Sequence, residues 1–165
     1  MHWASATAPS SNTAPTTLLQ LDALLATASD DAVTRFAEGP APAGLDHGPF
    51  GVVWAAAPAM RTRALRDYVA EHDDILNRTT LSTLMFLAAR LGEEALAVEL
   101  MRKTFIDHDG FSGYWFIWSQ TLRDTRRTEA FKDFLRDLGL VDLWRQTGEW
   151  GDFCRPIGDD DFECA

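Results

Sequence analysis

Cysteine, histidine and long apolar runs are scarce in this chain, and each scarcity excludes a class of protein. Its 165 residues include two cysteines and four histidines, with no histidine near either cysteine. A structural zinc site needs four ligands, so none is expected there. No apolar stretch approaches the roughly 18 residues of a membrane-spanning helix. The N-terminus also lacks the basic start and apolar segment of an export signal, so we expect a cytoplasmic protein without membrane insertion.

Basic residues are also in deficit. Fifteen Lys and Arg stand against 25 Asp and Glu, which gives a net charge of -10. This charge repels phosphate backbones, so nucleic-acid binding is not expected. Arg123, Arg126 and Arg127 form the main basic cluster, which we interpret as a solvated helix end or turn. Phosphate-binding glycine loops and the HExxH and GxSxG motifs are absent, and we predict no catalytic residue, cofactor or metal ion.

The composition predicts a folded domain behind a short linker. Hydrophobic residues make up 46% of the chain, which is too much for disorder over most of its length. Ala, Ser, Thr and Pro dominate positions 4 to 17, a composition that cannot bury enough apolar surface to order itself. We therefore expect a disordered linker over residues 1–17 and a single helical domain over residues 18–165.

Apolar residues recur at helical spacing through this domain, and no segment shows the sustained alternation of a strand. The five clearest stripes are Leu18, Leu21, Leu25 and Ala28; Leu65, Tyr68, Val69 and His72; Leu81, Leu84, Met85, Ala88 and Leu91; Ala97, Leu100, Met101, Thr104 and Phe105; and Phe131, Phe134, Leu135 and Leu138. The pattern predicts an all-α fold, and a sheet is not expected.

Glycine, proline and serine divide these helices. Ser29 is a candidate cap for a short second helix, and Gly92 and Gly139 are candidate helix ends. Residues 39–51 hold three prolines and four glycines, so we expect a loop there and helices again from about Trp54.

An alanine followed by a large apolar residue recurs three times. The three alanines are Ala64, Ala95 and Ala130, and they are 31 and 35 residues apart. Stacked helical hairpins repeat about every 34 residues. A small residue allows a neighbouring helix to approach closely. On this register, Ala95→Trp is expected to destabilise the fold strongly, whereas Arg127→Ala trims a solvated side chain and changes little.

Two segments carry a resemblance to a known family. Leu87 to Phe105, LAARLGEEALAVELMRKTF, resembles a tetratricopeptide hairpin with its turn at Leu91-Gly92. The tail resembles the one that follows such repeats in some bacterial signalling and regulatory proteins, where Gly-Leu precedes Trp-Arg-x-x-Gly-x-Trp-Pro-Asp-Phe-Cys. The matching residues are Gly139, Leu140, Trp144, Arg145, Gly148, Trp150, Asp152, Phe153 and Cys154. Gly151 stands where the pattern has proline.

The resemblance implies an α-solenoid of three or four stacked antiparallel hairpins, closed by a capping helix and tail from about residue 140. It also implies a non-catalytic protein–protein interaction module of a bacterial signalling or regulatory system, because peptides dock in the grooves of such arrays. An end repeat lacks a neighbour, so we expect Trp144 and Trp150 to pack inward. The aromatic residues between Phe105 and Trp118 are too dense for one buried face. Tyr114, Trp115 and Trp118 are therefore the predicted contacts to a protein or peptide partner.

Two other functions stay open at this point. One is a small helical enzyme that uses His47, in a glycine-rich loop, with neighbouring acids. The other is a structural fragment of a larger regulator.

For the two cysteines, Cys154 and Cys164, free thiols are favoured because no export signal is seen, and a disulfide stays open as the alternative. Reducing agent is then expected to leave the melting temperature nearly unchanged. The acidic run at Asp159, Asp160, Asp161 and Glu163 is interpreted as a solvated tail.

Overall fold

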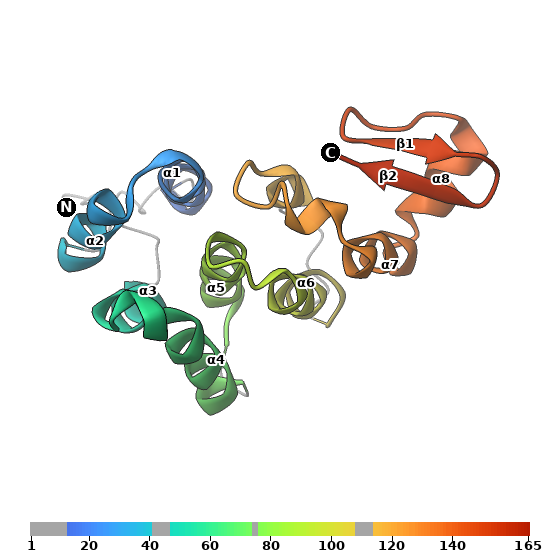
Figure 1. The fold of residues 1–165 in the computed structure, drawn as a ribbon. Helices are drawn as coiled ribbons and strands as arrows, with labels where there is room; N and C mark the ends of the chain where they lie inside the picture. Colours follow the sequence, from blue (N-terminus) through green and yellow to red (C-terminus); the bar gives the residue numbers. More distant parts are fainter. Residues whose placement is uncertain (1–12, 41–46, 74–75, 108–113) are drawn as a thin grey trace, which may run out of the picture.

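The computed structural model describes residues 13–40, 47–73, 76–107 and 114–165. These residues form eight α-helices, four shorter helical segments and one two-stranded antiparallel sheet. The chain is therefore mostly helical, as predicted, but the expectation that it has no sheet is wrong. Figure 1 shows the helices following one another across the molecule to a hairpin of strands at the C-terminal end. Among the described residues, no helix has the length and apolar character to cross a membrane.

The predicted stripe from Leu18 to Ala28 and the predicted short second helix after Ser29 form a helical hairpin. It consists of α1 (Thr13–Thr27) and α2 (Asp30–Glu38). The Ser29 side chain accepts a hydrogen bond from the Ala32 N–H at 3.4 Å and so caps α2. Two acidic residues in the first turn of α2, Asp30 and Asp31, add a favourable interaction with the helix dipole.

Two helices begin earlier than the sequence suggested. Residues 1–12 of the predicted linker lie outside the described residues, but Thr13–Thr17 already belong to α1. The next helix, α3 (His47–Ala55), occupies the end of the predicted 39–51 loop, of which residues 41–46 lie outside the described part. Pro15 and Pro49 each fall in the first turn of their helix, where proline is tolerated because those N–H groups have no intrahelical partner.

The middle of the chain forms two further helical pairs. A short 3-10 turn, η1 (Pro58–Met60), leads into α4 (Arg61–His72), and α5 (Arg78–Arg90) turns into α6 (Glu94–Arg102). The turn is at Gly92, as predicted, where φ is +73°. Only glycine adopts that backbone conformation readily. A single π-helical turn, η2 (Lys103–Asp107), continues α6.

The core is centred on α5. Nine consecutive residues of this helix, Thr80 to Ala88, are buried, since α1, α3, α4 and α6 all pack against it. All five predicted stripes are buried or half-buried. The contact between α1 and α5 joins the first helical pair to the third and skips the α3–α4 pair. This half of the molecule therefore departs from an array in which each unit touches only its neighbours.

The register inferred from the alanines is wrong. Ala95 and Ala130 are exposed and Ala64 is only half-buried, whereas Ala97, two residues further along α6, is fully buried. Residues two apart on a helix point in nearly opposite directions, because each residue adds 100°. The close helix contact therefore falls on Ala97.

We expect Ala97→Trp to lower the free energy of unfolding by about 1–3 kcal/mol or more, because the ring has no space in the core. The matched variant Ala95→Trp should stay within about 0.5 kcal/mol of the parent protein. Urea unfolding of both variants measures the difference. Equal midpoints would show that the two faces of α6 are assigned incorrectly.

The C-terminal part begins with two 3-10 segments, η3 (Tyr114–Trp118) and η4 (Thr125–Arg127), followed by α7 (Glu129–Asp137) and α8 (Leu140–Thr147). The Thr128 hydroxyl caps α7 by accepting from the Phe131 N–H at 3.2 Å. Gly139 and Gly148, with φ of +74° and +73°, turn the chain before and after α8. Residues 140–165 are referred to below as the cap.

The last part of the cap is a β-hairpin of β1 (Cys154–Ile157) and β2 (Asp161–Cys164). Its register pairs Cys154 directly with Cys164, and the two form a disulfide. The favoured interpretation as free thiols is therefore wrong, and the alternative of a disulfide holds. The turn at Gly158 reverses the chain and brings the two cysteines opposite each other, although they are ten residues apart in sequence.

The acidic run over residues 159–163 is not simply a solvated tail, because Asp161 forms ion pairs that connect the hairpin to α7. Its carboxylate lies 3.2 Å from the Lys132 ammonium and 3.4 Å from the Arg136 guanidinium. Hydrogen bonds from the Phe162 N–H and from Lys132 hold the pKa of Asp161 below its ordinary value of 3.8. A depressed carboxyl pKa stabilises the fold above that ordinary value, and the contribution is lost as the pH falls through the folded pKa.

Asp161→Asn is therefore expected to lower the melting temperature at neutral pH. The difference from the parent protein should begin to shrink as the pH falls below about 4 and vanish below the folded pKa of Asp161. Asp159→Asn in the same turn is the matched control, since Asp159 makes no side-chain contact with a described cation. Thermal melts across this pH range measure both variants. A difference that persists at low pH would mean that the carboxylate charge is not what stabilises the hairpin.

Candidate functional site

Of the three predicted partner contacts, Trp118 has a described side chain. Its ring stacks on Phe153 with centroids 5.3 Å apart and packs edge-on against the buried Phe131 at 6.2 Å. Trp118 is half-buried, so it is anchored in the core and still reaches the surface. Tyr114 and Trp115 open the η3 segment, but their side chains lie outside the described part of the structure.

Trp118 lines a predominantly apolar groove of about 410 Å³ between η3 and the cap. We call it the cap groove; its lining residues are Ile117, Trp118, Leu140, Trp144, Gly151, Asp152 and Phe153. Ligand pockets in proteins typically have volumes of about 300–1,000 Å³. The cap groove therefore has room for one or two side chains of a bound chain.

Two tryptophans hold the floor of this groove in place. Trp144 on α8 is buried, and its ring lies 6.3 Å from Trp118 and 5.4 Å from the half-buried Trp150. Trp150 in turn packs against Phe162 of β2 at 5.8 Å. The prediction that Trp144 and Trp150 pack inward is confirmed, and the result is a continuous row of rings from η3 to the hairpin.

Arg126 fixes the hairpin against η3. Its guanidinium donates hydrogen bonds to the main-chain oxygens of Ser119 at 2.6 Å and Ala165 at 2.8 Å, and it lies over the Phe153 ring at 5.1 Å. Arg126 is only 2% exposed, so the interpretation of this residue as solvated is wrong. Burial lowers its pKa. Arg123 and Arg127 are exposed, as expected.

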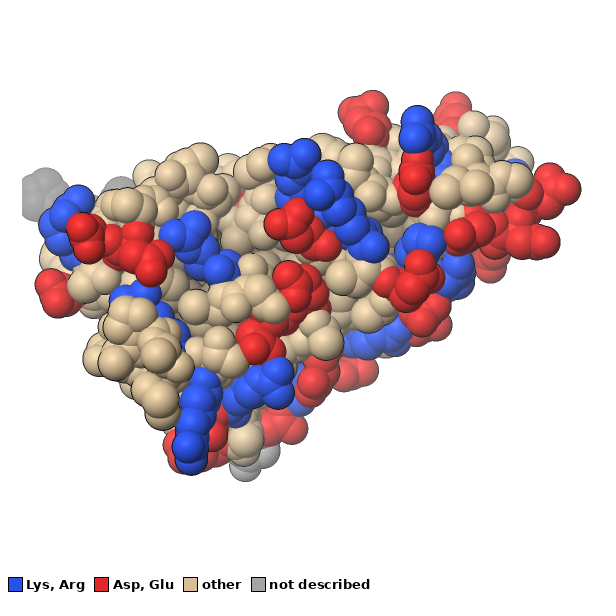
Figure 2. All heavy atoms as spheres, viewed as in Figure 1, with Lys and Arg blue, Asp and Glu red and all other residues tan. Residues whose placement is uncertain are grey.

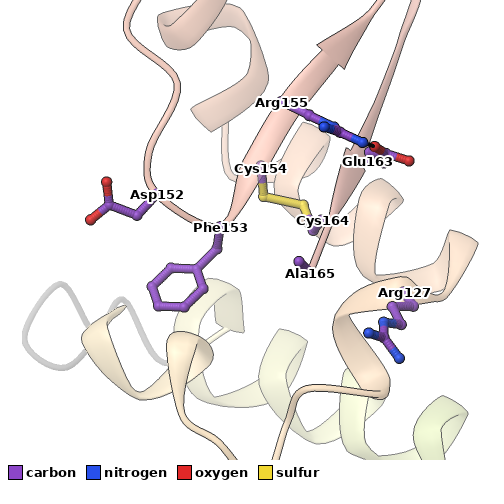
Figure 3. A pocket seen from close by; sticks show the side chains of 8 residues that line it. All are labelled: Arg127, Asp152, Phe153, Cys154, Arg155, Glu163, Cys164 and Ala165. Atoms are coloured by element: carbon purple, nitrogen blue, oxygen red, sulfur yellow. Dashed lines mark hydrogen bonds and ion pairs between the residues drawn. A yellow bond between two sulfur atoms is a disulfide. The ribbon is translucent and has the colours of Figure 1, made fainter.

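Phe153 also lines a second pocket, of about 470 Å³, which Figure 3 shows from close by. We call it the disulfide pocket; its lining residues are Arg127, Asp152, Phe153, Cys154, Arg155, Glu163, Cys164 and Ala165. Figure 3 shows the disulfide at its centre, with Phe153 on one side and Arg127 on the other. Arg155 and Glu163 form an ion pair across the strands, and Arg127 pairs with Asp124 at 3.3 Å.

Asp152 is the charged residue of the cap groove. It is exposed, and its carboxylate forms no hydrogen bond or ion pair with the residues that the structure describes. A carboxylate at the edge of an apolar groove is available to a positively charged group on a ligand. The chemistry of this groove is therefore apolar contact combined with one accessible negative charge.

The catalytic alternative rested on His47, which is the first residue of α3 and whose side chain lies outside the described part. His72, at the end of α4, stacks on Tyr68 and uses Nδ1 in a hydrogen bond to the Tyr68 carbonyl at 2.9 Å. No group of three or more His, Cys, Asp or Glu in the described ranges is arranged to hold a metal ion.

Comparisons of the chain with protein-family models, with curated proteins and with solved structures found no match.

Proposed function

We propose that this chain is a non-catalytic protein-binding module that holds a segment of its partner in the cap groove. The observation that carries the proposal is the position of Trp118. Trp118 is one of the three partner contacts predicted from the sequence, and it lines an apolar groove with two other aromatic residues, Trp144 and Phe153. Aromatic side chains supply large contact areas and are enriched at protein interfaces.

The likeness of residues 87–105 and of the tail to tetratricopeptide proteins supports a helical-repeat module of a bacterial signalling or regulatory system. The packing of α6 against α7, and of α7 against α8, is compatible with stacked hairpins closed by a cap. In this proposal, the binding surface is the cap groove between η3 and the cap.

Gly151 offers a direct test of the groove. A Cβ built at this position meets no atom within 4 Å, and Gly151 lines the groove, so Gly151→Phe can place a ring at the groove without a clash at its Cβ. Peptides selected from a random display library on the immobilised parent chain should bind Gly151→Phe at least roughly tenfold more weakly, because most of the apolar contact area is lost.

The matched control is Gly51→Phe in α3, where an added Cβ also meets no atom within 4 Å. This variant should bind the selected peptides like the parent chain. A library that yields no binder, or binders indifferent to Gly151→Phe, would overturn the proposal that the cap groove is the partner site. Melting curves of both variants verify that each is folded.

A further inference from the structure

We propose that the occupant of the cap groove is a basic peptide segment that carries one apolar anchor side chain. This inference rests on the proposed function and specifies the chemistry of the partner. It combines two observations, the apolar lining of the groove and the distribution of charge around it.

The residues that line the groove indicate that the anchor side chain is apolar. Six of the seven lining residues are apolar or glycine, namely Ile117, Trp118, Leu140, Trp144, Gly151 and Phe153. An aliphatic or aromatic side chain in a groove of about 410 Å³ would exclude water from these rings, and such burial is favourable by roughly 25 cal/mol per Å² of apolar surface. A segment without such a side chain would gain little in this groove.

The charge around the groove indicates which residues should flank the anchor in the bound peptide. Asp152 is the charged lining residue. The cap carries seven acidic and two basic side chains, a net charge of -5 in the last 26 residues, half of the -10 of the whole chain. Figure 2 shows acidic side chains to be prominent at the cap end of the molecule. Lys or Arg next to the anchor would meet a complementary potential, whereas an acidic segment would be repelled.

The same charge disfavours a second copy of this chain as the occupant. In a twofold dimer the same patch lies on both sides of the interface, so each acidic cap would face another. Addition of a partner strand to β1 is also disfavoured, because Pro156 has no N–H to donate along that edge. The occupant that fits is a basic segment from a different protein.

Three pools of fluorescent 12-residue peptides test this inference. In the first pool one Leu, Phe or Trp is flanked by Lys and Arg; in the second the flanks are Asp and Glu; in the third the basic flanks surround Ser. Fluorescence anisotropy at about 0.15 M salt is the measurement, since charges more than roughly 8 Å apart are largely screened there. Only the first pool should bind measurably.

Two charge variants distinguish the contribution of the Asp152 carboxylate to peptide binding from that of the net charge of the chain. Asp152→Lys should weaken binding of the first pool by roughly five- to tenfold, the loss expected when one attractive contact becomes repulsive. Asp142→Lys makes the same change in net charge on α8, at an exposed position outside the groove lining, and should leave binding unchanged. Neither residue has a described ion pair. Asp142 lies in the first turn of α8, where a lysine is unfavourable to the helix dipole, so melting curves of both variants verify that each is folded.

Other results of these peptide and variant measurements would contradict the inference in different ways. Equal binding of the acidic pool would overturn the inferred partner chemistry and leave the groove as a partner site. Equal weakening by Asp152→Lys and Asp142→Lys would show attraction to the whole chain and overturn the inference. Binding of the serine pool at the level of the first would show that no anchor is used. Failure of the proposed function itself is recognised separately, by a display library that yields no binder sensitive to Gly151→Phe.

Discussion

Replacing Trp144 with alanine is expected to lower the free energy of unfolding by about 3–5 kcal/mol, the usual cost of removing a buried large aromatic side chain. The Trp144 ring is only 9% exposed and lies between Trp118 and Trp150. Its removal leaves a cavity where α8 meets η3 and breaks the row of rings that supports the hairpin. Urea unfolding followed by circular dichroism measures the change.

Leu143→Ala is the matched control, because Leu143 precedes Trp144 on the same helix and is 51% exposed. Its loss should change the free energy of unfolding by no more than about 0.5 kcal/mol. Similar unfolding midpoints for the two variants would mean that α8 does not pack on its Trp144 side. A Trp144→Ala variant as stable as the parent would show that the packed rings around Trp144 do not stabilise the fold.

Reduction of the Cys154–Cys164 disulfide is expected to destabilise the protein by about 2.7 kcal/mol, the chain-entropy value for a closed loop of about ten residues. For a chain of this length the melting temperature should fall by roughly 5–10 °C. This replaces the small effect expected from sequence alone, because the structure pairs the two cysteines across the hairpin. Thermal melts with and without a thiol reductant measure the shift.

The double variant Cys154→Ala/Cys164→Ala is the control, because its melting temperature should not respond to the reductant. Titration of free thiols in the unfolded, unreduced protein should find none. Two free thiols in that titration, together with an unchanged melting temperature in reductant, would restore the free-thiol interpretation.

The helices could be predicted from the sequence because their cause is local. Each buried stripe repeats at helical spacing, and Gly92 and Gly139 mark turns that need a positive φ. The alanine register failed because three short matches do not distinguish one face of a helix from the other. The stripe that contains Ala97, predicted independently, already placed Ala95 on the opposite face of α6.

The cap groove could be predicted only in part, because its residues are brought together by long-range contacts. Trp118 was predicted as a partner contact and Trp144 as an inward-packing ring, while Phe153 was recognised only as part of the tail pattern. The hairpin has strands of four residues each, too short for alternation to be informative. Burial of Arg126 leaves no sequence signal either, since its acceptors are main-chain oxygens that any residue supplies.

The central position of α5 determines which parts of the fold can unfold locally under native conditions. Amide hydrogens of this helix lie at the centre of the fold, beneath four other helices, so they should exchange with solvent only when the whole chain unfolds. The cap lies at one end of the molecule (Figure 1), where sub-global openings cost less free energy. The cap can therefore rearrange locally while the protected centre stays closed.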